Sequence, residues 1–202
     1  MTYKFTMDFS IDGSTQKNIT HILSTRGLPK SVLEIGVFEG KTTFWTAETL
    51  DRFYHDYTYY AIDPHSTSSD IDWIELTDVK SNFLHNLQSY GGDSIRYVNK
   101  TSTQALAEFI WSNTVFDFIY VDGDHRASQV LTDLSLSWEC LSVGGVILCD
   151  DATDWKFTDR NGVSSAQMSP RMAIETFIMC NWDRLQIVKL PDSSQTAFVK
   201  IA

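Results

Sequence analysis

The stretch VLEIGVFEGKTT, residues 32–43, decides the fold class of this chain. A short apolar, β-branched run over Ser31–Ile35 is typical of a buried strand. Gly36 and Gly40 follow it, and glycines let the backbone turn tightly and let a ligand approach it closely. A helical pattern then covers Gly40–Leu50. A strand, a glycine turn and a helix in this order predict the first βα unit of a parallel sheet.

The same alternation continues along the chain. Helical patterns cover residues 72–89, 103–111 and 127–141, and each follows a strand-like run. These further strand-like runs are Tyr57–Ile62, Ile95–Val98, Phe116–Val121 and Val146–Cys149. Continuous apolar strands that alternate with helices indicate a parallel sheet with helices on both of its faces.

The C-terminal part departs from this alternation. Ser169 and Pro170 have the residue types of the N-cap and first position of a helix. Two strand-like runs follow, Leu185–Leu190 and Thr196–Ile201, and the turn sequence PDSS between them predicts an antiparallel hairpin. We therefore expect an α/β fold with a doubly wound, mostly parallel seven-stranded sheet and a C-terminal antiparallel β-hairpin.

The length of 202 residues predicts a single domain over residues 1–202. Before the first strand, Ser14–Arg26 has a helical pattern that Gly27 closes. We interpret residues 1–30 as an N-terminal helical cap of this domain.

The charge balance excludes two classes of partner. Asp and Glu number 26 and Lys and Arg number 16, which gives a net charge of −10. A nucleic-acid binder or a protein that docks on an anionic membrane needs a basic face, so we expect neither partner. The three cysteines are sparse and show no metal-binding spacing, which predicts reduced core cysteines. With no signal-peptide pattern and no apolar run of membrane-spanning length, we expect a cytoplasmic protein.

Polar side chains follow every predicted parallel strand at the point where it ends. The carboxyl ends of parallel strands meet at one edge of the sheet, where ligands bind in doubly wound folds. The residues that follow the five strands are Gly36–Gly40, Asp63–His65, Asn99–Ser102, Asp122–His125 and Asp150–Asp151. We therefore place the ligand site at this edge.

The loop after the first strand lacks two known phosphate-binding patterns. Because position 38 is Phe38, the GxGxxG fingerprint is absent, and Gly36 to Gly40 is one residue too short for a P-loop. Asp63 ends the second strand, where an acid can accept hydrogen bonds from both hydroxyls of a ribose. A ribose without phosphates in acidic surroundings points to a cationic nucleoside rather than to NAD. The alternative is that the two glycines serve only a tight turn.

Four segments together carry a resemblance to a known family. They are VLEIGVFEGKTT (32–43), AIDP (61–64), FDFIYVDGDH (116–125) and LSVGGVILCDD (141–151). They resemble class I S-adenosylmethionine-dependent methyltransferases, in the branch of the macrocin-type sugar O-methyltransferases and, more remotely, the caffeoyl-CoA and catechol enzymes. The resemblance covers nearly the whole chain, and it implies a Rossmann-like fold with S-adenosylmethionine as cofactor.

The resemblance also implies a cofactor site. It places Gly36 and Gly40 beside the methionine part of the cofactor, Asp63 on the ribose, and Ser102 near the adenine or methionine end. The full set that it assigns to the cofactor is Glu34, Gly36, Phe38, Gly40, Asp63, Ser102 and Asp122.

Metal-dependent relatives carry an acid after the fourth strand and a pair of acids, or an acid and an amide, after the fifth. The resemblance therefore implies a divalent metal at Asp122, Asp150 and Asp151. Hard oxygen ligands suit Mg²⁺, Mn²⁺ or Ca²⁺, and three converging carboxylates repel one another unless a cation lies between them. The alternative is that Asp150 and Asp151 bind substrate or stabilise the neighbouring turn.

His125 follows Asp122 by three residues, at the position where macrocin-like enzymes carry a catalytic base. A histidine can take a hydroxyl proton at neutral pH. The resemblance thus implies that Asp122 and His125 are catalytic; the alternative is that His125 only caps the following helix.

Residues 152–169 form a long polar segment directly after the acidic pair, and we interpret them as a lid or substrate loop that includes Trp155. The loop that contains His65 has the composition of a solvated loop, with a place at the substrate mouth as the alternative.

The function that we expect is transfer of a methyl group from S-adenosylmethionine to a hydroxyl of a small molecule, either a sugar or a secondary metabolite, assisted by a divalent metal. Three alternatives stay open: a metal-independent methyltransferase, a catalytically degenerate domain that only binds the cofactor, and an NAD-dependent oxidoreductase. A homodimer is a further expectation, because relatives often pair.

Overall fold

The structure is a computed structural model, and it describes residues 2–7, 13–66, 78–153 and 169–202. Its helices are α1 (Ser14–Arg26), α2 (Lys41–Asp51), α3 (Val79–Tyr90), α4 (Ser102–Trp111), α5 (Ala127–Cys140) and α6 (Pro170–Cys180). Its strands are β1 (Ser31–Ile35), β2 (Thr58–Ile62), β3 (Ile95–Val98), β4 (Phe116–Val121), β5 (Leu141–Cys149), β6 (Leu185–Val188) and β7 (Thr196–Lys200).

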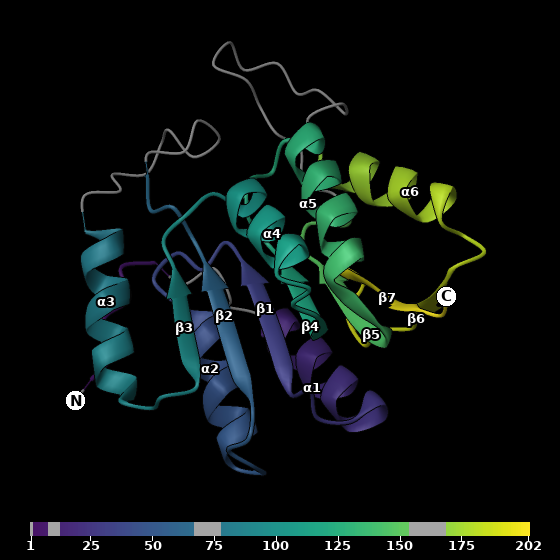
Figure 1. The fold of residues 1–202 in the computed structure, drawn as a ribbon. Helices are drawn as coiled ribbons and strands as arrows, with labels where there is room; N and C mark the ends of the chain where they lie inside the picture. The colour runs from purple at the N-terminus through teal and green to yellow at the C-terminus, as the bar shows by residue number, and fades with distance from the viewer. Residues whose placement is uncertain (1, 8–12, 67–77, 154–168) are drawn as a thin grey trace.

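The seven strands form one sheet in the order β3-β2-β1-β4-β5-β7-β6 (Figure 1). The pairs among β1 to β5 are all parallel, whereas β7 runs antiparallel to both of its neighbours, β5 and β6. This confirms the predicted α/β fold with a mostly parallel sheet and a C-terminal hairpin. The order reverses between β1 and β4, and in open α/β sheets ligands bind at such a reversal point.

Helices cover both faces of the sheet, and each face has its own core. Alternate strand residues point to opposite faces, so Leu33 and Ile35 pack toward α4, α5 and α6, while Val32 and Tyr59 pack toward α1, α2 and α3. Figure 1 shows the first group of helices in front of the sheet and α1 and α2 behind it. Burial on both faces explains why these strands read as continuous apolar runs rather than as an alternating pattern.

Several predicted boundaries differ from the observed ones. Strand β5 begins at Leu141 rather than at Val146, because a register shift against β4 accommodates two glycines in its first half. Helix α3 begins at Val79, and most of the earlier turns predicted for it lie outside the described residues. The expectation of three core cysteines is wrong for Cys180, which is exposed at the end of α6. Among the described helices, none is both long and apolar enough to cross a membrane.

Candidate active site

The loop between β1 and α2 lies at the reversal point of the sheet, directly against the loop that follows β4. Gly36 has a φ of +82°, and a Cβ at this position would lie 2.0 Å from the carbonyl oxygen of Asp122. Gly40 has a φ of +84°, and a Cβ there would lie 2.2 Å from the ring of Phe44. Both glycines are therefore required by the protein itself, through their backbone conformation and through the close approach of neighbouring groups.

Asp63, at the end of β2, fixes the conformation of this glycine loop. One of its carboxylate oxygens accepts hydrogen bonds from the backbone amides of Val37 and Phe38, both at 3.0 Å. Its other oxygen accepts from the amide of His65 at 2.7 Å. An ionised carboxylate has about four acceptor positions, so Asp63 retains capacity for a ligand hydroxyl.

The side chain of His65 is buried rather than solvated, whereas its neighbours Pro64 and Ser66 are exposed and the rest of this loop lies outside the described residues. Its Nε2 lies 2.7 Å from the carbonyl oxygen of Phe38 and its Nδ1 lies 2.6 Å from the hydroxyl of Tyr97. Because a carbonyl only accepts, Nε2 donates to it. Phe38 has a φ of +49°, a conformation that is uncommon for a residue with a side chain, and His65 and Asp63 hold it there.

Asp122, His125 and Asp151 form the only group of three or more possible metal-ligating side chains within the described residues. One ligand atom from each lies within 4.8 Å of the others. The Nε2 of His125 lies 3.0 Å from a carboxylate oxygen of Asp151, so this acid orients the imidazole. Burial, together with the nearby Asp150 and Asp151, raises the pKa of Asp122 well above its usual range. A cation bound between these side chains would relieve that repulsion.

Asp150 differs from the predicted ligand set, because its carboxylate is turned toward protein donors. It accepts hydrogen bonds from the hydroxyl of Tyr120 at 2.6 Å, from Nε2 of Gln195 at 3.0 Å and from the amide of Asp151 at 2.9 Å. The buried Tyr120 hydroxyl also lies 3.0 Å from Asp122. The structure therefore brings Asp122, His125 and Asp151 together, whereas the carboxylate of Asp150 is hydrogen-bonded to Tyr120 and Gln195.

One edge of the sheet therefore carries the glycine loop, Asp63 and the cluster of Asp122, His125 and Asp151; we call this edge the rim. The model of a family described as a methyltransferase domain matches residues 33–152, which include this entire rim. The chain belongs to the methyltransferase domain family. The resemblance predicted from the sequence is thereby confirmed.

Solved methyltransferase structures share this fold along most of the chain. An O-methyltransferase from Bacillus cereus in complex with S-adenosylhomocysteine (SAH) has a TM-score of 0.64 and 18% identity, with 97% of this chain and 84% of that one covered. The SAH-bound methyltransferase PaMTH1 from Podospora anserina has a TM-score of 0.62 and 17% identity, with 92% and 77% covered. The calicheamicin methyltransferase CalS11 has a TM-score of 0.61 and 14% identity, with 93% and 77% covered. No curated protein matches the chain.

Glu34 and Ser102, two further residues of the cofactor set that the resemblance implies, also hydrogen-bond to other residues of the protein. Glu34 is buried on the α2 side of the sheet and accepts hydrogen bonds from Thr43 at 2.5 Å and Tyr59 at 2.8 Å. Ser102 begins α4, and its hydroxyl lies 3.3 Å from the side-chain nitrogen of Gln129. It also bonds to Asp133, a buried acid of α5 whose pKa burial raises to about 6. Asp133 carries no sequence signal, because it lies mid-helix within an ordinary amphipathic pattern.

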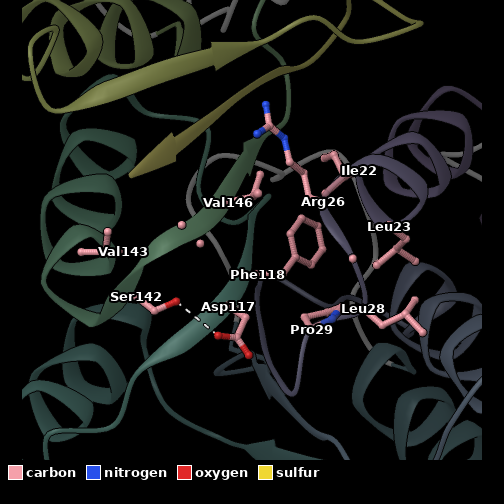
Figure 2. Close-up of a pocket in the computed structure, with 13 residues that line it drawn as sticks. Ile22, Leu23, Arg26, Leu28, Pro29, Asp117, Phe118, Ser142, Val143 and Val146 are labelled. Atoms are coloured by element: carbon pink, nitrogen blue, oxygen red, sulfur yellow. Dashed lines mark hydrogen bonds between the residues drawn. The ribbon is translucent and has the colours of Figure 1, made fainter. Parts of the chain in front are cut away.

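The predicted lid at 152–169 falls almost entirely outside the described residues, as does Trp155. Figure 2 shows a different pocket of about 340 Å³, between the end of α1 and the first residues of β4 and β5. It lies at the amino ends of the strands, opposite the rim. Its carboxylate, Asp117, already accepts from Ser142 and from the amides of Lys30 and Ser31. The pocket is therefore separate from the candidate active site of this methyltransferase.

Glu34 predicts a pH dependence of stability. Its burial raises its pKa to about 7, so the folded state holds a proton that the unfolded state has already released above about pH 4.5. The free energy of unfolding should therefore fall as the pH rises from about 4.5 to about 7, by on the order of 3 kcal/mol from this group. In Glu34→Gln this contribution should disappear, whereas Glu139→Gln, at an exposed glutamate of α5, should keep it. Urea unfolding at several pH values measures the difference, and equal pH slopes in both variants would contradict the prediction.

Proposed function

We propose that this methyltransferase domain transfers the methyl group of S-adenosylmethionine to a hydroxyl oxygen of a small molecule, a sugar or a secondary metabolite. The observation that carries the proposal is the cluster of Asp122, His125 and Asp151, because it lies beside the glycine loop at the reversal point of the sheet. Methyl transfer to a hydroxyl needs a base and an acid that orients it, whereas a domain that only binds the cofactor needs neither.

We place the donor beside Gly36 and Asp63. The spare acceptor capacity of Asp63 suits ribose hydroxyls, and the acids of the rim suit a positively charged sulfonium. The SAH that is present in the related structures supports the same class of ligand. Glu34 and His65 contribute by holding α2 and the loop in place, so they are positioning residues.

His125 acts as the base in this proposal. Asp151 accepts from the Nε2 proton of the imidazole, and this tautomer leaves the lone pair on Nδ1. As the oxygen of the acceptor forms a bond to the methyl carbon, the carbon–sulfur bond breaks and the hydroxyl proton passes to His125. The products are a methyl ether and neutral SAH, and the imidazolium is stabilised by Asp151 in the manner of other acid–histidine pairs.

The acids of the rim also fit a divalent cation. Asp122 and Asp151 offer hard oxygen ligands; burial and then repulsion from Asp150 and Asp151 raise the pKa of Asp122, and a cation would offset that repulsion. When bound, such an ion lowers the pKa of a coordinated hydroxyl and orients it. Asp151 has two carboxylate oxygens, so it can hold His125 with one and serve the cation with the other. The metal-independent enzyme is the alternative, in which Asp122 only stabilises charge on His125.

Calorimetric titration tests the donor. SAH should bind and NAD should not, and Asp63→Ala should weaken SAH binding by about 1–3 kcal/mol, because ribose donors lose an acceptor and the loop loses its anchor. Asp56→Ala, at an exposed acid outside the rim, is the matched control and should bind SAH as the wild type does. Binding of NAD without binding of SAH would overturn the assignment.

Release of SAH in the presence of single acceptors tests the reaction. A panel of sugars and phenolic metabolites should include at least one hydroxyl compound that raises SAH release above the rate without acceptor. SAH binding together with no turnover on any acceptor of the panel would favour a degenerate domain that only binds the cofactor.

A further inference from the structure

Residues near the start of the chain contact the glycine loop at Glu39, a residue that Asp63 does not hold. We name residues 2–7 the N-terminal strap. The backbone amide of Thr6 donates to one carboxylate oxygen of Glu39 at 2.6 Å, and the hydroxyl of Thr6 donates to the other at 2.7 Å. Glu39 immediately precedes Gly40, and only 1% of it is exposed. The strap therefore contacts the cofactor loop itself rather than its surroundings.

Two asparagines of α3 complete this contact. Asn82 donates to the Glu39 carboxylate at 2.8 Å. Asn86 donates to the backbone carbonyl of Glu39 at 2.9 Å and exchanges two hydrogen bonds with the backbone of Lys4, at 2.7 and 2.8 Å. Figure 1 shows the N-terminus beside α3. In the described part of the chain, no basic side chain pairs with Glu39, so its carboxylate depends on neutral donors, and Thr6 supplies two of the three.

The strap also packs on the helix that follows the loop. The ring of Tyr3 is stacked on that of Phe44, with centroids 5.3 Å apart, and its hydroxyl donates to Glu48 at 2.6 Å. Phe44 is the residue whose ring leaves no space for a side chain at position 40. Tyr3 thus anchors the strap to α2, and none of its hydrogen bonds in the described residues involves residues 36–39.

The loop held between these contacts has an unfavourable backbone. Gly36, Phe38 and Gly40 all have positive φ, and Phe38 is not a glycine. Asp63 and His65 hold residues 37 and 38, and among the described residues the side chain of Glu39 is held by the strap and α3. If the loop leaves this conformation, the fraction of binding-competent protein falls, and the apparent affinity falls by the same factor.

We propose that Glu39 is a positioning residue for the cofactor, and that docking of the N-terminal strap on Glu39 and binding of the cofactor strengthen each other. The proposal rests on the cofactor site assigned above. Coupling between two such events is reciprocal: whatever the strap adds to cofactor affinity, the cofactor adds to strap docking. The strap thereby becomes a means by which the start of the chain controls the affinity of the site.

Two strap variants, each lacking one hydroxyl, test the proposal. Thr6→Val removes the hydroxyl bond to Glu39 and keeps the backbone amide bond, and Tyr3→Phe removes the bond to Glu48 while keeping the ring stacked. Calorimetry with SAH should give a dissociation constant about 5–100-fold higher for Thr6→Val and unchanged for Tyr3→Phe. Glu39→Gln replaces one carboxylate oxygen by an NH₂ group that cannot accept a hydrogen bond from Thr6 or Asn82. It should weaken SAH binding to a similar extent.

Hydrogen exchange gives the reciprocal readout. SAH should slow amide exchange in residues 3–6 of the wild type, and Thr6→Val should speed exchange in residues 37–40 of the free protein. Equal affinities in both strap variants, or strap exchange unaffected by SAH, would overturn the coupling while leaving the cofactor site intact. A wild type that binds no SAH would overturn the proposed function and, with it, the coupling.

Discussion

Replacing His125 with alanine is expected to lower the turnover number by about 10²–10⁴-fold, the usual contribution of a positioned general base. The imidazole lies 3.0 Å from Asp151, which holds it beside Asp122, where we propose that the acceptor meets the methyl group. Without the imidazole, the hydroxyl proton loses the base to which we assign it. The dissociation constant of SAH should stay within about twofold of the wild-type value, because the base serves the acceptor rather than the donor.

The matched controls separate this role from a structural one. His55→Ala removes an exposed histidine that pairs only with Asp51 among the described residues, and its turnover should equal that of the wild type. Measured in excess chelator, which removes any role of Asp151 in holding a cation, Asp151→Asn should lower turnover less than His125→Ala. The double variant should be no slower there than His125→Ala alone, because both residues then act on one proton transfer. Full activity of His125→Ala would show that His125 is not the catalytic base.

The fold followed from the sequence because local signals and tertiary packing agree in it. Strand runs such as Phe116–Val121 are apolar on both faces, which only a doubly covered parallel sheet explains, and the structure has this strand with the same bounds. The insertion of β7 between β5 and β6 carried no local signal. A hairpin turn predicts that β6 and β7 pair with each other, but it does not indicate which of the two strands also pairs with β5. The extension of β5 back to Leu141 was hidden by its two glycines, which favour turns.

The positions of the rim residues were predictable, but their side-chain partners were not. Parallel topology alone brings Asp63, Asp122 and Asp151 to one edge. In contrast, Asp150 turns toward Gln195, 45 residues farther along the chain, and Glu39 meets Thr6, 33 residues earlier. Neither contact involves a motif, since threonine and glutamine are common surface residues; in the structure Thr6 stays exposed, whereas Gln195 is buried.

Removal of divalent cations is expected to lower turnover by about 10²–10³-fold, which corresponds to the several kcal/mol that Lewis-acid stabilisation supplies. The physical reason lies in the acids themselves. Burial raises the pKa of both Asp122 and Asp150; the charges of Asp150 and Asp151 raise that of Asp122 further, and the charge of Asp151 raises that of Asp150 further. Several buried carboxylates that lie close together destabilise the folded protein when they are ionised, unless a positive charge lies between them. Turnover should fall in excess chelator and return when Mg²⁺ or Mn²⁺ is added in excess of the chelator, while SAH binding stays the same.

Asparagine variants then show which acids hold the ion. Calorimetry with Mn²⁺ and no acceptor should show weakened binding for Asp122→Asn and Asp151→Asn. If the geometry of this structure is the bound one, Asp150→Asn should bind Mn²⁺ nearly as the wild type does, because Tyr120 and Gln195 already occupy its carboxylate. Loss of Mn²⁺ binding in all three variants would instead support the set of Asp122, Asp150 and Asp151 implied by the family resemblance, and would mean that Asp150 exchanges its protein donors for the ion. Undiminished methyl transfer in excess chelator would discard the metal, leaving His125 and Asp151 to move the proton alone.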